Sequence, residues 1–435
     1  MSASRHALLA TATCAFLLCT SASAAEPPRA DAARLESRIK ALGQFGANPE
    51  GGVSRVAFSD ADIAGREYIA SLMRAAGLTV RVDAAGNLIG RREGTDTRLA
   101  PIVLGSHTDS VPGGGNYDGP VGVIGAIEAI ELMNAQRLKT RHPIEVVSFV
   151  DEEGGTVGSR GMIGELDEGA LNEQSHSGFT AREGIRRLGG NPEQLAGAAR
   201  KHGDIAAYLE LHIEQGAILE ESNLDIGVVE GIVGIRWWDV TIDGIANHAG
   251  TTPMNRRRDA LLSAAELALA VNRIANEMPG RQVATVGRIQ ALPGAPNVIP
   301  GKVRMSLEIR DLDSAKMQQV FDQVEAEAKR IASQRNTPIS FDELDVAIKP
   351  APTDPRVRDL IAKAAQSLGL KYQRMPSGAG HDAQHIARIA PAGMIFVPSV
   401  GGISHSPKEY TSPEDMANGV NVLLRTTLAL DGQAR

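Results

Sequence analysis

Four short apolar segments of this sequence each lead to residue types that commonly bind divalent metal ions. The segments, 101–106, 144–150, 206–211 and 393–397, precede His107, the run Asp151-Glu152-Glu153, His212 and, after a glycine-containing loop, His405. In α/β proteins, ligand sites form beyond the carboxyl ends of parallel strands. We therefore predict that four distant segments meet at one cleft of a metalloenzyme.

The length and composition are those of an ordinary globular protein. The chain has 435 residues, of which 43% are hydrophobic and 22% are charged, so it is long enough for two or three domains. Only 3% of the residues are aromatic and the net charge is −7. Because such a chain offers few stacking platforms and no large basic surface, we do not expect a nucleic-acid partner.

Residues 1–24 are predicted to be a signal peptide. A positively charged start precedes the apolar stretch 7–19, and small residues ending at Ala24 fit a cleavage site. We expect a protein that is periplasmic or secreted and has no membrane anchor after cleavage, because the stretch is short for a bilayer span. A buried N-terminal helix is the alternative. Both cysteines, Cys14 and Cys19, lie in this segment, so the mature metal site must use nitrogen and oxygen ligands.

The order of the expected elements divides the mature chain into two domains. Helices and strands alternate over 30–226 and again over 345–435, which predicts an α/β catalytic domain with a mixed sheet. The segment 227–344 has the order βαββαβ, which predicts an inserted α+β domain with two helices on one face of an antiparallel sheet. Its expected elements are strand 235–242, helix 258–277, strands 282–290 and 302–310, helix 314–334 and strand 339–344.

The first group of candidate ligands surrounds a glycine-rich loop. Residues 113–119 contain four glycines among seven residues, and their conformational freedom allows Asp118 to return beside His107. A carboxylate often accepts the second N–H of a metal-bound imidazole, so Asp109 is a candidate to orient His107. Taken alone, His107 could equally be a core histidine and Asp118 a helix cap.

The acidic run after the second apolar segment contains neighbouring carboxylates that can take two different roles. One carboxylate can bind a metal ion while its neighbour exchanges protons, although a solvated acidic turn is the alternative for Asp151-Glu152-Glu153. His212 is flanked by polar residues that can face a substrate, and a partly buried histidine at a strand end is its alternative. His405 follows two glycines that allow its loop to approach closely.

The chain resembles the amidohydrolase branch of the M20 metallopeptidase-like family. This branch includes N-carbamoyl-L-amino-acid hydrolases, allantoate amidohydrolases and β-ureidopropionases. The resemblance extends from about residue 33 to residue 430. The motifs that carry it are, in chain order, 105–111, 113–122, 151–155 with 158–160, 210–216, 247–254, 296–297, 308–311, 377–383 and 402–409.

The resemblance implies two divalent metal ions in each subunit, zinc or else manganese, cobalt or nickel. The implied ligands are His107 and His212 for one ion, Glu153 and His405 for the other, and Asp118 shared by both. Glu152 would be the general acid/base that assists a hydroxide lying between the ions, and Asp109 would orient His107. The family also implies a cis peptide bond between Asp118 and Gly119.

The resemblance also assigns roles to the inserted domain. This domain would serve as a lid and as the contact of a homodimer, in which His248 reaches the neighbouring subunit's cleft and stabilises an oxyanion. Asn297 and Arg310 would hold the carboxylate of a small-molecule substrate, and Gln215 would face the same substrate. His381 and Asp382 match a further family motif that lies near the cleft, without an assigned role.

Together these features predict an exported enzyme that cleaves the ureido C–N bond of N-carbamoyl-L-amino acids or of related ureides such as allantoate. An exported aminoacylase or dipeptidase of the same family, acting on N-acyl amino acids, is the alternative enzyme. A non-catalytic metal-binding protein is the alternative from a different class. Release of ammonia from carbamoyl substrates separates the first enzyme from the second.

Overall fold

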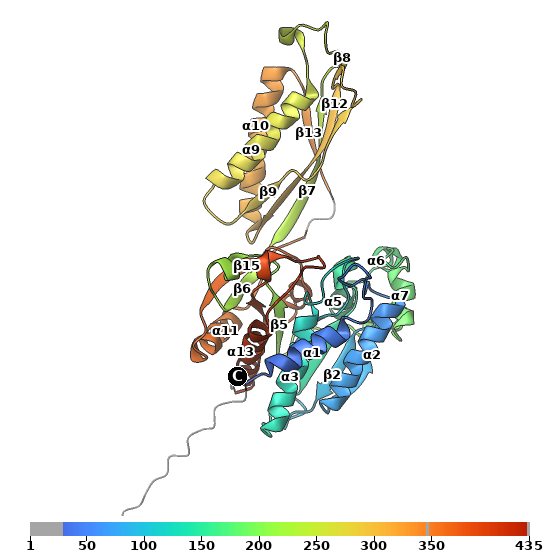
Figure 1. Ribbon diagram of the computed structural model, residues 1–435, viewed down its shortest axis with the longest axis vertical. Coiled ribbons are helices and arrows are strands. Elements are labelled where there is room, and N and C mark those ends of the chain that lie inside the picture. The colour runs from blue at the N-terminus through green and yellow to red at the C-terminus, as the bar shows by residue number, and fades with distance from the viewer. Residues whose placement is uncertain (1–28, 345–347, 433–435) are drawn as a thin grey trace, which may run out of the picture.

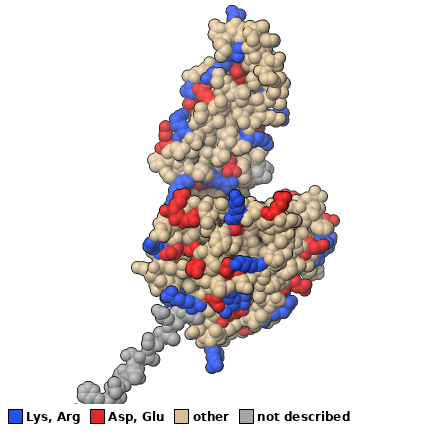
Figure 2. All heavy atoms as spheres, viewed as in Figure 1, with Lys and Arg blue, Asp and Glu red and all other residues tan. Residues whose placement is uncertain are grey.

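The computed structural model describes residues 29–344 and 348–432. The predicted signal peptide, 1–24, lies outside the described residues. A large α/β part carries a long, narrower part that is inserted into it (Figure 1). Basic and acidic side chains are interspersed over both parts on the face shown in Figure 2. Within the described ranges, no helix is long and apolar enough to span a bilayer.

The large part is built on a nine-stranded mixed sheet. Its strand order is β1-β2-β4-β3-β5-β16-β6-β14, and β15 pairs with β6 outside this path. The strands are β1 (Thr79–Val82), β2 (Leu88–Arg92), β3 (Ile102–His107), β4 (Ile144–Phe149), β5 (Ala207–Ile213), β6 (Ile226–Ile232), β14 (Ala351–Pro352), β15 (Tyr372–Ser377) and β16 (Ala392–Val397). The mixed α/β architecture predicted for this part is confirmed.

The four central strands β4, β3, β5 and β16 are parallel neighbours. Every residue of these strands is buried, which is why each reads as a continuous apolar run rather than an alternating one. Because the four strands point in one direction, their carboxyl ends meet at one edge of the sheet. The candidate ligands that follow these strands are thereby brought to that edge.

Helices cover both faces of the large sheet. On one face, the largest core cluster packs α1 (Ala32–Leu42), α3 (Pro120–Ala135), α11 (Pro355–Ser367) and α13 (Pro413–Gly432) against the strands, with α2 (Asp60–Ala75) at its edge. On the other face, a second cluster includes residues of α5 (Val157–Met162), α8 (Ile218–Glu221) and α12 (Ala383–Ile386). Shorter helices are α4 (Glu152–Gly155), α6 (Glu168–Asn172) and α7 (Ala181–Arg187). Short 3₁₀ turns cover Pro192–Gly197, Met254–Arg256 and Val400–Gly402.

The inserted part is an antiparallel sheet of five strands in the order β10-β12-β7-β13, with β9 also pairing with β12. Its elements are β7 (Gly234–Asp243), α9 (Ala260–Glu277), β9 (Val283–Thr285), β10 (Ile289–Leu292), β12 (Lys302–Asp311), α10 (Ser314–Arg335) and β13 (Ile339–Glu343). The helices α9 and α10 pack on the sheet through a separate apolar core. A short pair, β8 (Asn247–His248) and β11 (Val298–Ile299), lies at the end remote from the large sheet (Figure 1).

Two details of the insert differ from the sequence expectation. The single strand expected over 282–290 is two strands, because the register shifts by one residue between the pairs Thr285↔Glu308 and Ile289↔Met305. An extra residue of this kind is a β-bulge, which interrupts the ladder. The chain also leaves the large sheet later than expected, since β6 extends to Ile232 and the small sheet begins at Gly234 rather than near 227.

Candidate metal-binding active site

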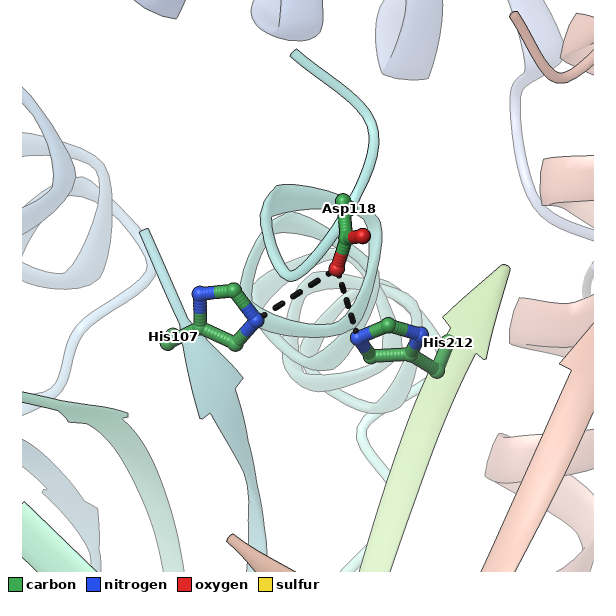
Figure 3. A group of neighbouring side chains, drawn as sticks. All are labelled: His107, Asp118 and His212. Atoms are coloured by element: carbon green, nitrogen blue, oxygen red, sulfur yellow. Dashed lines mark ion pairs between the residues drawn. The ribbon is translucent and has the colours of Figure 1, made fainter. Parts of the chain in front are cut away.

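Two histidines and one aspartate meet at the carboxyl edge of the parallel strands. His107 is the last residue of β3, His212 lies near the end of β5, and Asp118 lies on the loop before α3. The carboxylate stands between the two rings (Figure 3), with Asp118 Oδ1 3.6 Å from His107 Nε2 and 3.1 Å from His212 Nε2. All three side chains are buried, and they form a group that could hold a metal ion.

A second group shares the same aspartate. His405 Nε2 lies 3.3 Å from Asp118 Oδ2 and 3.3 Å from Glu153 Oε2. Glu153 belongs to the short helix α4 after β4, and His405 lies on the loop after β16. Asp118 thus presents one oxygen to each group, which is the arrangement expected of a carboxylate between two ligand sets.

The polar atoms of the first group suit a cation. His107 Nδ1 lies 3.1 Å from the Asp109 carbonyl oxygen and His212 Nδ1 lies 2.9 Å from the Ile213 carbonyl oxygen. When these rings are neutral and each Nδ1–H donates to its carbonyl, each Nε2 carries a lone pair that can bind a cation. Both Nε2 atoms are buried and have no hydrogen-bond partner in the described parts of the chain. Orphaned buried acceptors beside a carboxylate fit a divalent ion.

The role expected for the Asp109 carboxylate needs correction. It is the backbone carbonyl of Asp109 that receives His107 Nδ1–H, whereas Asp109 Oδ1 lies 3.6 Å from that nitrogen. The Asp109 carboxylate accepts hydrogen bonds from the backbone N–H groups of Glu152, at 3.4 Å, and Glu153, at 3.2 Å. Asp109 therefore holds the turn that carries both glutamates, besides orienting the ring through its main chain.

The expected cis peptide between Asp118 and Gly119 is wrong for this structure. Within residues 29–344 and 348–432 the only cis bond precedes Pro293. Gly119 makes the turn instead with a positive φ of 81°. A Cβ atom on Gly119 would lie 2.5 Å from the His107 ring, so glycine is required there both for its φ and for the close approach of the imidazole.

Glu152 stands beside the first group. Its Oε2 lies 3.7 Å from His107 Nε2 and its side chain is only 9% exposed. Burial raises the pKa of Glu152 well above its ordinary value, and the nearby carboxylates of Glu153 and Asp382 add to the increase against the opposing effect of His107. Burial also disfavours the Asp118 carboxylate, but the imidazoles around it lower its pKa well below the usual range. The same cluster of charges thus moves the pKa values of these two neighbouring carboxyls in opposite directions.

Gln215 reaches the same carboxylate. Gln215 Nε2 donates to Asp118 Oδ2 at 2.5 Å, and Gln215 has the uncommon positive φ of 59°. Its Oε1 is buried and has no partner among the described residues. The side chain thus lies at the junction between the ligand groups and the cleft, where a substrate would be expected.

Glu409 is a functional candidate to which the sequence alone assigned no role. Its carboxylate accepts from the backbone N–H groups of Tyr117 and Asp118, at 2.8 and 3.0 Å, and from that of His405 at 3.1 Å. Ser404 Oγ lies within hydrogen-bonding distance of both Glu409, at 3.0 Å, and Asp118, at 2.8 Å. Glu409 therefore joins the loops that carry two of the ligands. The only signal for it in the sequence is that the motif 402–409 ends at this residue.

We expect Glu409→Ala to weaken metal binding by about 10–100-fold, the usual effect of removing a group that orients a ligand. The reason is that the Asp118 and His405 loops lose their common acceptor. Metal affinity can be measured by competition with a chromogenic chelator. Glu67→Ala, on the exposed face of α2, is the control, and equal affinities for the two variants would contradict the assignment.

His381 and Asp382 are buried rather than on the cleft surface. The His381 ring packs edge-to-face on His212 with centroids 4.5 Å apart, and its Nε2 lies 2.7 Å from Ser377 Oγ. Burial lowers the pKa of His381 well below its ordinary value, and burial followed by the charge of Glu210 raises that of Asp382. His381 thus supports the His212 ring from inside the protein.

Glu210 is a further buried residue beside His212 and His381. Glu210, His212 and His381 form a third group with metal-ligand geometry. However, the Glu210 carboxylate already accepts from Ser106 Oγ at 2.9 Å, Tyr208 Oη at 2.9 Å and the Ala383 N–H at 3.1 Å. Because its oxygens are occupied, Glu210 is better suited to support His212 than to bind an ion.

The three candidates in the insert are not brought together within one chain. His248 and Asn297 are exposed neighbours at the remote end, where the Ala249 N–H donates to the Asn297 carbonyl. Arg310 lies at the opposite end of β12, where its guanidinium donates to Glu308 and to the Gly378 carbonyl at 2.7 Å. Eight strand residues, about 26 Å at 3.3 Å each, separate Arg310 from the start of β12. One chain therefore cannot use both Asn297 and Arg310 on one carboxylate.

A cleft of about 1070 Å³ opens beside the ligand groups. Glu152, Glu153, Gln215 and His405 line it on one side. The rest of the lining comes from residues 154–156, 160, 348–352 and 379–380, from α12, and from residues 387 and 388 after it. The cleft thus gives a small molecule access to the metal-binding groups and to Glu152.

Comparison with known proteins agrees with this site. The chain belongs to peptidase family M20/M25/M40, whose model matches residues 103–429. It is 43% identical over 402 residues to the N-carbamoyl-L-amino acid amidohydrolase of Geobacillus stearothermophilus, covering 91% of this chain and 98% of the relative. It is 37% identical to the allantoate amidohydrolase of Bacillus subtilis, covering 88% and 94%.

Solved structures agree with the same branch of the family. An amidase of the hydantoinase/carbamoylase family from Burkholderia multivorans superposes with a TM-score of 0.88 at 38% identity, covering 94% of this chain and 99% of that one. The predicted membership in the M20 family is confirmed. The protein is a metal-dependent hydrolase of C–N bonds other than peptide bonds, related to enzymes named for carbamoyl amino acids and allantoate.

Proposed function

We propose that this protein hydrolyses the ureido C–N bond of N-carbamoyl-L-amino acids or of allantoate-type ureides, with two divalent ions in each subunit. The observation that carries the proposal is Asp118, which is shared by two metal-capable groups beside Glu152. Three histidines and two carboxylates suit zinc, and also manganese, cobalt or nickel. The names of the most similar relatives support a ureide as the substrate.

The chemistry follows from the residues that line the cleft. When bound, divalent ions lower the pKa of an attacking water molecule and polarise the substrate carbonyl. Glu152 accepts a proton from that water and returns it to the departing nitrogen. Gln215 is placed to orient the substrate beside Asp118. One carbamoyl amino acid and one water then give the amino acid, ammonia and carbon dioxide.

A substrate panel on the metal-loaded mature protein tests this proposal. We expect ammonia release from N-carbamoyl-L-amino acids or allantoate, lost on chelation and restored by divalent ions. Faster release of amino acid from N-acyl amino acids or dipeptides would favour the aminoacylase or dipeptidase alternative. A metal-loaded protein that turns over nothing in the panel would favour a binding protein.

We also propose export, on the strength of residues 1–24 alone. The expected product is a periplasmic or secreted chain that begins soon after Ala24. N-terminal sequencing of the protein recovered from each cell fraction tests this, and an intact N-terminus in the cytoplasmic fraction would contradict it.

A homodimer is part of the proposal. Most of the large apolar side chains exposed in the described residues lie on the insert, and Met254 and Leu269 are each 74% exposed. Exposed apolar residues of this kind favour a protein contact. His248 and Asn297 lie together at the remote end of the insert, so we propose that His248 of the partner subunit, accompanied by Asn297 of the partner subunit, completes each cleft.

Mixed dimers can test this contribution. Asp118→Asn disables a subunit's own metal site, whereas His248→Ala removes only the group given to its neighbour, a donor typically worth about 10²–10³ in kcat. After equal mixing and subunit exchange, about a quarter of the sites in a two-fold symmetric dimer should regain full function. Activity is measured against each variant alone. No recovery in dimers shown to have exchanged would mean that His248 does not act across the interface.

A further inference from the structure

The cleft continues past the metal-binding groups into a region that the proposed chemistry does not use. This distal region is lined by Thr156 and Arg160, by Gln384 and His385 of α12, and by Arg388. Ligand pockets usually measure about 300–1,000 Å³, so a cleft of about 1070 Å³ has room for more than a reacting ureido group. A substituent of the substrate can occupy this space.

The polar side chains of the distal region are held in place. Thr156 has a positive φ of 50°, which is a rare conformation for a β-branched residue and is found where the surroundings impose it. Its hydroxyl lies 2.8 Å from the Gly155 carbonyl and 2.8 Å from His385 Nε2, and Gln384 Nε2 lies 3.1 Å from the same nitrogen. These contacts connect the turn after Glu153 to α12 along the wall of the cleft.

The charge of this region is positive. Among residues 29–344 and 348–432, the carboxylates that line the cleft are Glu152 and Glu153, which belong to the metal-binding side. Arg388 pairs with Glu165. Arg160, in contrast, makes one hydrogen bond, to the Gly155 carbonyl at 3.4 Å, and pairs with no carboxylate among residues 29–344 and 348–432.

The imidazole of His385 contributes hydrogen bonding rather than charge. Burial lowers the pKa of His385 to about 4, and the charges of Arg160 and Arg388 act in the same direction. The ring is therefore neutral near pH 7. Arg160 and Lys349, which also lines the cleft, are the cations there that have no carboxylate partner in the described chain. Of the two, Arg160 is the one whose charge acts on the His385 ring.

We propose that the distal region is a specificity subsite in which Arg160 binds a carboxylate on the substituent of the substrate. The preferred substrate is then an N-carbamoyl acidic amino acid or a similar ureido dicarboxylate, and Thr156 and His385 shape the wall against which that substituent lies. A planar guanidinium pairs well with a carboxylate. This subsite rests on the proposed ureidohydrolase function and is separate from Arg310, whose guanidinium is occupied by Glu308 and Gly378.

Two substrates of nearly equal shape test the subsite. We expect wild-type kcat/KM to favour N-carbamoyl-L-glutamate over N-carbamoyl-L-glutamine by about tenfold or more, because a charge-assisted pair replaces a neutral contact. Arg160→Met should reduce that ratio by about tenfold, and Arg160→Lys should retain part of it. Arg74→Met, on the exposed side of α2, is the control and should keep the wild-type ratio.

Binding measurements separate this inference from the proposed function. In a Glu152→Gln background, which suppresses turnover, N-carbamoyl-L-glutamate should bind with a lower dissociation constant than N-carbamoyl-L-glutamine. Adding Arg160→Met to that background should remove the difference. A panel in which no ureide is hydrolysed overturns the proposed function. A ratio near one in the wild type, a ratio unchanged by Arg160→Met, or binding of neither ligand overturns the subsite.

Discussion

Replacing Glu152 with glutamine should lower kcat by about 10²–10⁴-fold, the usual contribution of a general acid/base. Glutamine keeps the size of the side chain but cannot accept a proton from water or return it to a leaving nitrogen. Glu152 Oε2 lies 3.7 Å from His107 Nε2, beside the metal-binding group rather than between its members. We therefore expect the metal content to stay at the wild-type level while turnover falls.

The measurement is ammonia release under saturating substrate, together with elemental analysis of the same preparation. Glu67→Gln, on the exposed face of α2, is the matched control and should keep the wild-type kcat. A Glu152→Gln enzyme that holds its metal and keeps more than about a tenth of the activity would exclude Glu152 as the main proton carrier.

Replacing Asp118 with asparagine should weaken both metal-binding groups at once. Each Asp118 oxygen faces one group, at 3.1 Å from His212 Nε2 and 3.3 Å from His405 Nε2. Asparagine offers one neutral oxygen in place of two charged ones. We expect metal affinity to fall by at least about 100-fold, since mutating a group that only orients a ligand already lowers affinity by up to that factor. Activity should fall together with the loss of metal.

Glu153→Gln is the informative comparison for Asp118→Asn. Glu153 contacts only the group that contains His405, so its variant should lose one class of ion and keep the other. Elemental analysis after gel filtration, combined with titration of each apoprotein, distinguishes the two patterns. If Asp118→Asn loses no more metal than Glu153→Gln does, the two groups do not share Asp118.

Much of the large domain follows from local sequence. The apolar runs before His107 and His212 are strands β3 and β5, because a strand that is covered on both faces needs an uninterrupted apolar run. Ser59 caps α2 by accepting a hydrogen bond from the Asp62 N–H, the role for which serine is preferred at the start of a helix. The order βαββαβ also anticipated the small sheet with α9 and α10 on it.

Other features could not be predicted because they depend on pairs of distant residues or on small shifts of register. The bulge between β9 and β10 reflects how that segment meets β12. The hydrogen bond between Glu409 and the Asp118 N–H joins residues 291 positions apart. The distance between Asn297 and Arg310 within one chain likewise becomes evident only from the structure, in which they lie at opposite ends of β12.

By itself, the sequence determined which segments become buried strands, which residues follow their carboxyl ends, and the family to which the chain belongs, because these properties reside in local runs and motifs. Only the tertiary structure decided that the backbone carbonyl of Asp109, rather than its carboxylate, accepts the hydrogen bond from His107 Nδ1. It also decided that the chain turns at Gly119 without a cis peptide bond, and that Arg160 and His385 line the same cleft. Those outcomes depend on distances of a few ångströms between segments remote in sequence, where local patterns carry no information.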